Sequence, residues 1–392
     1  MPSDPIVILS ARRTAIGSLL GQFTSVTSPQ LGAAAIRAAV ADSGVKPEEI
    51  GEVIMGCVLP AAVGQAPARQ ASLGAGIPKS VGCTTINKVC GSGMKATMLA
   101  HDLIVAGTAD IMVAGGMESM TNAPHMLHAR AGIKYGESKL IDHMAWDGLT
   151  NPYDGQAMGA CGELCAEKFH FTREQQDAFA IESVKRAQRA VADGSFAAEI
   201  VPVTVKTRKG EVSVDRDEEP GRCDIAKIPT LRPAFKKDGT VTAASSSSIS
   251  DGAAALVLMR ESVAKQKGVK PMARILGHTS FAQEPIWFTT SPVSAIDRLQ
   301  KQLGWSEKNV DLYEINEAFA VVTMAAMQEL QLPHTKVNVN GGACALGHPI
   351  GCSGARLIVT LLHALQARHL QRGIASLCIG GGEATAIAVE ML

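Results

Sequence analysis

The chain has 392 residues, of which 46% are hydrophobic, so it can bury a core large enough for two or three domains. Lys and Arg together number 37, as do Asp and Glu, so the net charge is zero and no overall field attracts nucleic acid or a membrane. Nine cysteines, an odd number in a core-rich chain, favour free thiols in a reducing compartment. With no membrane-span-like run and a strand-like run beginning at Ile6, we expect a cytoplasmic protein without a signal peptide.

Strand-like and helical segments alternate in the first third of the chain. The predicted order is strand 6–9, loop 12–17, helix 29–42, strand 53–55, strand 84–86, a helix ending near Ala106, and strand 110–114 closed by Gly115 and Gly116. Strands that alternate with helices predict a mostly parallel sheet covered on both faces. The fold class is therefore α/β.

Cys90 lies between a strand-like run and the start of the helix that ends near Ala106. Gly91 and Gly93 keep the space around the sulfur clear and allow a sharp turn. At a helix N-terminus the macrodipole and free N–H groups would favour a thiolate, so a reactive cysteine is one interpretation. The alternative is a small buried apolar residue, as most free cysteines are.

The region from about Ser119 to Ala243 has a different character. It opens with a His- and Met-rich loop and contains a helix over 172–193, for which Thr172 is the predicted N-cap and Gln175 its capping-box partner. From Lys206 to Lys237 it carries nine basic and six acidic residues. This stretch is either a site for an anionic ligand or a solvated loop.

An internal repeat links the two ends of the chain. The segment that begins at Gly44 resembles the one at Gly304, and Ser92-Gly93-Met94-Lys95 resembles Ser353-Gly354-Ala355-Arg356, 261 residues later. A third pair, Val113–Gly116 and Cys378–Gly381, lies 265 residues apart. The common order and spacing predict two copies of a β/α domain that pack about a pseudo-twofold axis.

Three further stretches could carry chemistry with Cys90. His348 lies in a glycine-rich bend before a helix, Cys378 ends a β-run followed by glycines, and Asn316 leaves a strand. Their structural alternatives are a packed histidine, a buried strand cysteine and an N-cap. If the repeat brings them to one cleft, His348 could take the thiol proton of Cys90, and the Cys90 and Gly380 N–H groups could hold an oxyanion.

Other site classes find little support in the sequence. Cys161 and Cys165 lie four residues apart, but no second pair follows at zinc-like spacing, so we expect no metal site. The chain contains no Walker A sequence, and no Gly-x-Gly-x-x-Gly opens a helix after the first strand.

Six motifs together resemble the thiolase family, specifically its short-chain acetyl-CoA acetyltransferases. They are Arg13–Gly17, Asn87–Gly93, Gly115–Met120, Asn316–Phe319, Gly347–Pro349 and Cys378–Gly382, in family order. The resemblance implies duplicated βαβαβαββ domains with five-stranded mixed sheets and an inserted loop domain. The domains would be 1–118 with 244–270, the loop domain 119–243 for coenzyme A binding and oligomerisation, and 271–392.

The same resemblance implies the condensation of two acetyl-CoA molecules to acetoacetyl-CoA and CoA. Cys90 would carry the acetyl group, with His348 as its base, and Cys378 would take a proton from the second acetyl-CoA. His348 with a water on Asn316 would form one oxyanion hole, and the N–H groups of Cys90 and Gly380 the other. The family implies a homotetramer, and no cofactor beyond the coenzyme A thioester substrates.

The positions that match the family's coenzyme A contacts are Leu149, Met158, Arg222, Lys227, Ala243, Ser247, Phe288, Ala318 and Phe319. Ser245 and Ser246 replace the family's Asn-Ala, Ala157 replaces a histidine, and Glu383 an uncharged residue. Pro220 replaces the tyrosine of potassium-binding members, so we expect no potassium activation. Two alternatives stay open: a 3-ketoacyl-CoA thiolase for longer chains, which the bulk of Phe288 disfavours, and a non-catalytic acyl-CoA-binding protein.

Overall fold

One sheet of eleven strands runs through the computed structural model, which describes residues 4–392. Its first half has the order β4-β3-β5-β11-β1 and its second half β13-β14-β15-β12. The strands of the first half are β1 (Ile6–Thr14), β3 (Glu52–Gly56), β4 (Gly82–Ile86), β5 (Ile111–Ser119) and β11 (Ser250–Arg260). Those of the second half are β12 (Ala273–Ala282), β13 (Leu312–Ile315), β14 (Arg372–Ile379) and β15 (Glu383–Met391). Two short strands, β2 (Gly17–Ser18) and β8 (Ile200–Val201), pair with β11 and β1.

The two halves repeat one topology, as predicted. In the first half β4, β3 and β5 are parallel, and β5, β11 and β1 are antiparallel. In the second half β13 and β14 are parallel, and β14, β15 and β12 are antiparallel. The counterpart of β4 is reduced to one parallel bridge between Tyr313 and Val337. Antiparallel pairing of β1 with β12 joins the halves.

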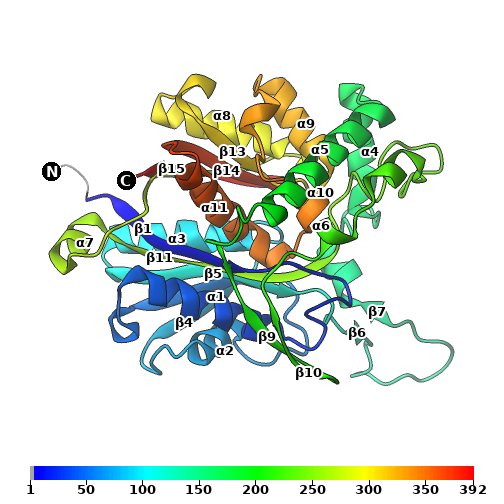
Figure 1. Cartoon of the computed structure of the whole chain (residues 1–392). Coiled ribbons are helices and arrows are strands. Elements are labelled where there is room, and N and C mark those ends of the chain that lie inside the picture. The colour runs from blue at the N-terminus through cyan, green and yellow to red at the C-terminus, as the bar shows by residue number, and fades with distance from the viewer. Residues whose placement is uncertain (1–3) are drawn as a thin grey trace.

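Helices form three layers around the two halves of the sheet (Figure 1). One outer layer is α1 (Ser28–Ser43) with α2 (Pro67–Gly74), and the other is α8 (Ser291–Leu303) with α9 (Ala320–Glu329). Helices α3 (Ser92–Ala106) and α11 (Ile350–Ala367) lie between the halves. Each contains one copy of the repeated Ser-Gly motif, and Cys90 and His348 lie just before the respective helices. The short helices α7 (Glu261–Lys267) and α10 (Ala343–Leu346) lie in the connections.

Backbone contact between α3 and α11 depends on two glycines. A Cβ on Gly93 would lie 2.8 Å from the Ala355 nitrogen, and a Cβ on Gly354 would lie 2.4 Å from the Met94 nitrogen. Both distances are too short for any side chain, so only glycine permits this approach. The contact holds the N-terminal ends of both helices at one place.

Helix α11 is long and apolar enough to cross a membrane, but most of it is buried between the two halves of the sheet. Such a helix is typical of the core of a large α/β protein. The expectation of no membrane-span-like run was therefore wrong on composition, because an interior helix passes the same test.

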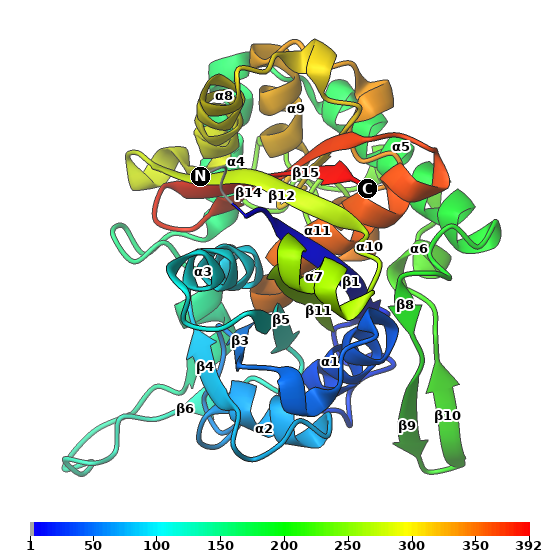
Figure 2. The ribbon, with the colours of Figure 1, turned by 90° about the vertical axis from the view of Figure 1, so that its left-hand side faces the viewer.

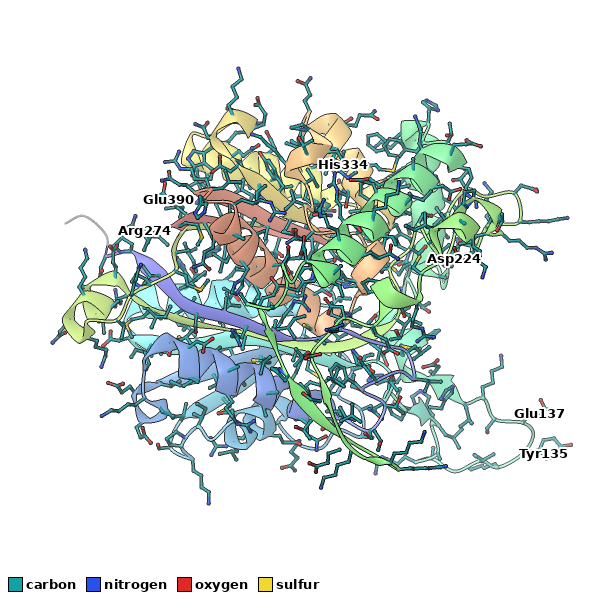
Figure 3. The ribbon with its side chains drawn as sticks, in the orientation of Figure 1. Tyr135, Glu137, Asp224, Arg274, His334 and Glu390 are labelled. Atoms are coloured by element: carbon teal, nitrogen blue, oxygen red, sulfur yellow. The ribbon has the colours of Figure 1, made fainter. Side chains whose placement is uncertain are left out.

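Residues 119–243 extend from this core (Figure 2). They include β6 (His125–Met126), β7 (Ile141–Asp142), α4 (Met158–Phe169), α5 (Arg173–Ala192), β9 (Val203–Thr207), β10 (Gly210–Val214) and α6 (Glu219–Arg222). Thr172 caps α5 in a capping box with Gln175, as predicted. Figure 3 shows Tyr135 and Glu137 on a loop that projects away from the body of the molecule.

Two predicted boundaries were wrong. Residues 12–14, predicted as loop, belong to β1, because Arg12 and Arg13 pair with β11 and Thr14 pairs with β8. Gly115 and Gly116 do not end a strand but lie inside β5. A Cβ at either glycine would come within about 2 Å of the Ala254 or Gly351 carbonyl oxygen. A glycine inside a strand marks a close backbone approach.

Candidate active site

A strained turn between β4 and α3 presents Cys90. Val89 has φ 47°, a left-handed conformation that is costly for a β-branched residue. The turn is held by Ser92, whose hydroxyl accepts from the Lys88 N–H at 2.8 Å and donates to the Val89 carbonyl at 2.7 Å. Gly91 leaves room for the Ile379 side chain, whose Cδ1 would lie 2.3 Å from a Cβ at this position. The strain at Val89 was not predictable from local sequence.

The surroundings of the Cys90 thiol oppose its ionisation, although a helix N-terminus by itself would favour a thiolate. Burial raises its pKa to about 11, and hydrogen bonds from the Gly380 N–H and from its own N–H only partly oppose this. Those two N–H groups are the ones predicted to form an oxyanion hole. The thiol therefore needs a base before it can act as a nucleophile.

His348 is held in a neutral form suited to this task. Its Nδ1 lies 2.5 Å from Ser353 Oγ, which in turn donates to the Pro349 carbonyl at 3.0 Å. This network assigns the ring proton to Nδ1 and leaves Nε2 unprotonated, so that it can accept a proton. Burial, aided by the charge of Arg356, lowers the pKa of His348 to about 3. Ser353 belongs to the repeat motif, but the sequence analysis assigned it no role.

Asn316 faces the same imidazole. Its Nδ2 lies 3.4 Å from His348 Nε2, and its buried Oδ1 has no hydrogen-bond partner within residues 4–392. A buried orphan oxygen of this kind is a place for a water or a substrate group. The alternative role as an N-cap was wrong, because α9 begins at Ala320 with Phe319 as its N-cap.

Cys378 is the residue before the last in β14 and is fully buried, packed with residues of the cavity wall such as Phe288 and Phe319. Burial, with the nearby Cys90, raises its pKa well above the usual range, so it too is a thiol at rest. Gly380, two residues on, reaches the cavity surface. No hydrogen bond joins Cys90 to His348 or to Cys378 in the described part of the chain, so any proton transfer needs the substrate or a small movement.

Cys90, His348 and Gly380 line one mainly apolar cavity of about 290 Å³. Of the predicted site residues, it is lined by Cys90, His348, Gly380, Leu149, Met158, Ser247, Phe288, Ala318 and Phe319. Further lining residues that were not predicted include Met120, Phe235, Ile249 and Ile350. Cys378 and Asn316 lie just behind the wall, whereas Arg222, Lys227 and Ala243 are outside it.

Three phenylalanines narrow the cavity. The Phe319 ring packs edge-on against Phe235 and Phe288, with ring centroids 5.8 and 6.4 Å apart. Phe288 is only 3% exposed, so its ring is held firmly. A long acyl chain would have to displace one of these rings.

Serine hydroxyls stabilise the loop 242–247, whose sequence differs from the usual pattern of the family. Ser245 Oγ accepts from the Thr242 N–H at 2.8 Å, and Ser246 Oγ donates to the Thr242 carbonyl at 2.7 Å. Ser247 donates to the Ala318 carbonyl at 3.0 Å through its hydroxyl. Glu383, another position that differs from the family, forms an ion pair with Lys88 next to the turn that presents Cys90.

The basic stretch lies at the surface and is partly neutralised. Arg222 pairs with Glu218 at 3.3 Å, and Lys227 with Asp224 at 3.4 Å. Both cations are largely exposed, and Figure 3 shows Asp224 on the outer face of this segment. Cys161 and Cys165 are buried in an apolar cluster rather than arranged around a metal.

Comparison with known proteins decides the family. The thiolase N-terminal domain model matches residues 6–262, and the thiolase C-terminal domain model matches residues 269–391. The chain belongs to the thiolase family. This thiolase is 51% identical to acetyl-CoA acetyltransferase 2 of Arabidopsis thaliana over all of this chain and 98% of the relative.

Two solved structures have the same fold. Acat5 thiolase from Ascaris suum, in complex with coenzyme A, has a TM-score of 0.94 and 44% identity, and the match covers 99% of this chain and 100% of that one. The Bacillus anthracis acetyl-CoA acetyltransferase has a TM-score of 0.97 and 41% identity, with 100% and 99% covered.

Proposed function

We propose that this thiolase is an acetyl-CoA C-acetyltransferase that condenses two acetyl-CoA molecules to acetoacetyl-CoA and CoA, reversibly. The observation that carries the proposal is the neutral His348, whose free Nε2 shares a cavity with the Cys90 thiol and the Gly380 N–H. Acyltransferase chemistry needs a nucleophile, a base and oxyanion donors in one dry site, and this cavity supplies all three.

In the first half-reaction the Cys90 sulfur attacks the thioester carbon while its proton passes to His348 Nε2. The carbonyl oxygen becomes an oxyanion, which N–H donors at the cavity wall stabilise. When the C–S bond to coenzyme A breaks, the leaving thiolate takes a proton from Cys378. This step gives acetyl-Cys90 and free CoA and leaves Cys378 as the thiolate that its raised pKa otherwise prevents.

In the second half-reaction the Cys378 thiolate removes a proton from the methyl group of a second acetyl-CoA. The enolate carbon attacks acetyl-Cys90 in a Claisen condensation, and the C–S bond to Cys90 breaks. His348 returns its proton to Cys90, so all three groups regain their resting states. Asn316 would hold a water beside His348, with its orphan Oδ1 as acceptor.

Coenzyme A would enter along the middle region. Leu149, Met158, Ser247 and Ala318 form cavity wall against which the apolar part of the pantetheine arm can pack. The exposed Arg222 and Lys227, with Ala243, would meet the phosphate-bearing end outside the cavity. The coenzyme A thioesters are then the substrates, and we propose no further cofactor.

Mass spectrometry of the intact protein tests the acyl-enzyme. Incubation with acetyl-CoA should add one acetyl group to the wild type and none to Cys90→Ser, while Cys83→Ser, which removes a thiol outside the cavity, should acetylate like the wild type. Absence of an adduct would favour a non-catalytic acyl-CoA-binding protein, and persistence of the adduct in Cys90→Ser would rule out Cys90 as the acyl carrier.

The acyl chain length of the preferred substrate distinguishes the proposed enzyme from a 3-ketoacyl-CoA thiolase. We expect faster thiolysis of acetoacetyl-CoA than of a long-chain 3-ketoacyl-CoA, because Phe288 fills the inner wall. Phe288→Ala should raise the relative kcat/KM for the longer substrate by about tenfold, which one to three kcal/mol of pocket discrimination allows. A wild-type preference for the long chain would favour the degradative enzyme.

We also propose the domain limits 1–118 with 244–270, 119–243 and 271–392, a homotetramer, and a cytoplasmic location. The nine free thiols support a reducing compartment. Relatives with 48% identity are named as cytosolic in Gibberella zeae and as mitochondrial in Bos taurus, so targeting differs within the family.

A further inference from the structure

A histidine–aspartate–histidine cluster lies outside the cavity, where the two halves of the sheet meet. His101 and Asp102 belong to α3, and His278 belongs to β12. The side chains of His101 and His278 are 19% and 15% exposed, and that of Asp102 is 52% exposed. The cluster is therefore held by protein on one side and open to solvent on the other.

Three donor atoms converge in this cluster. His101 Nδ1 lies 3.0 Å from Asp102 Oδ1 and 3.2 Å from His278 Nε2, and His278 Nε2 lies 2.9 Å from Asp102 Oδ1. The imidazole rings are nearly perpendicular, at 88°. Donors that bind one tetrahedral zinc at 2.0–2.1 Å are about 3.3 Å apart, so the observed triangle needs only a small expansion to hold the ion.

We propose that His101, Asp102 and His278 form a binding site for a divalent transition-metal ion of the zinc type. Two imidazoles and one carboxylate match the ligands that zinc takes, whereas magnesium prefers oxygen and water. The exposed side at Asp102 leaves a fourth position for water. The ion would connect α3 to β12 and so link the two halves of the chain, independently of the acetyl-transfer reaction.

Hydrogen bonds account less completely than a bound metal ion for the short distances among these three donor atoms. Both rings could donate to Asp102 Oδ1, but this would place two N–H groups side by side with nitrogens 3.2 Å apart. A cation would instead accept lone pairs from all three atoms at once. Lys95, also on α3, is the nearby charge that opposes a cation, so the site must rely on its ligands rather than on the surrounding field. Cysteine spacing alone could not reveal this cluster, because its ligands are histidine and aspartate side chains from two distant segments.

Equilibrium dialysis of the full-length, metal-stripped, reduced protein against zinc tests the proposal. Because free thiols also bind zinc, the measured quantity is the difference between His278→Gln and the control His128→Gln, which alters an exposed histidine elsewhere. The wild type and the control should retain one zinc per chain that His278→Gln lacks, and excess magnesium should not displace it. Equal zinc content in all three proteins would overturn the proposal and leave the hydrogen-bonded arrangement.

Two further measurements test the proposal even if His278→Gln fails to fold. Asp102→Asn changes a half-exposed side chain of nearly the same size and should weaken zinc binding by at least about tenfold. X-ray absorption at the zinc edge should show nitrogen and oxygen ligands at about 2.0–2.1 Å, whereas sulfur at about 2.3 Å would place the ion on cysteines and overturn the proposal.

Discussion

At the scale of single residues, the site depends on how His348 is oriented. The Ser353 hydroxyl fixes the ring from behind, because it gives its own hydrogen to Pro349 and can only accept from Nδ1. The proposed base therefore lies in the glycine-rich bend, and the hydroxyl that orients it belongs to the following helix, α11. Ser353 is a positioning residue rather than a catalytic one.

Ser353→Ala should slow acetylation of Cys90 by about 10- to 100-fold, below the full contribution of a general base. The ring would lose the acceptor that keeps its proton on Nδ1, so Nε2 would less often be free. The time course of adduct formation by intact mass measures this effect, and KM for acetyl-CoA should change little.

The matched control is Ser262→Ala, which removes a hydroxyl bonded to Asp4 far from the cavity. It should acetylate at the wild-type rate. An unchanged rate in Ser353→Ala would mean that Ser353 does not position the base.

At the scale of elements, a buried ion network connects β1 to the middle region. Arg13 is fully buried, and its two Nη atoms donate to the Asp217 carboxylate at 2.7 and 2.8 Å. Its Nε donates to Glu199 at 2.6 Å. The paired carboxylates raise the pKa of Arg13 against the effect of burial, so the guanidinium stays charged.

Arg13→Met should lower the free energy of unfolding by about 3–5 kcal/mol, because it leaves two buried carboxylates without their partner. Arg12→Met is the neighbouring control, since Arg12 forms a more exposed pair with Asp42 at 3.2 Å worth about 1 kcal/mol or less. Urea denaturation measures both variants. Equal effects at the two positions would contradict a special role for the buried network.

The sequence predicted which elements exist better than where they end. Apolar spacing located α1, α3 and α5 to within one or two residues, because helical periodicity is a local property. The strand boundaries depend on partners far along the chain, so β1 and β5 extended through an arginine pair and two glycines that local patterns assign to loops. The alternative interpretation of Asn316 as an N-cap was wrong for the same reason.

At the scale of the whole molecule, the loop between β6 and β7 is the most exposed apolar feature described. Tyr135 is fully exposed, and Leu140 and Ile133 are 67% and 52% exposed. Projecting apolar side chains of this kind mark an interaction site. We therefore expect contacts of the proposed homotetramer to involve this loop.

Changing Ile133, Tyr135 and Leu140 together to Ser should reduce the assembly from four chains of 41.0 kDa to a smaller species. Light scattering after gel filtration measures the mass. Lys134, Glu137 and Lys139 changed to Ser form the control on the same loop and should leave the tetramer intact. A full-mass assembly in the apolar variant would place the contacts elsewhere.

The site was predictable to the extent that it follows the repeat. The repeat spacing placed Cys90 and His348 at one cavity, and the resemblance supplied roles for Cys378 and Asn316. The raised pKa of Cys90 was not predictable, because burial depends on Ile379 and other distant residues that close over the turn. His101 and His278, 177 residues apart, gave no local pattern at all.

The crossing of α3 and α11 has the form of a contact between two identical partners. Gly93 meets Ala355 and Met94 meets Gly354, and these are equivalent positions in the two copies of the repeat, 261 residues apart. Such reciprocity between separate identical chains would create two equal sites. Here Gly351 stands where Cys90 would recur, so the first copy carries Cys90 whereas the second carries His348 and Cys378. The proposed reaction therefore draws its thiol nucleophile from one copy of the repeat and its base from the other, so the single chain makes one asymmetric site from two similar halves.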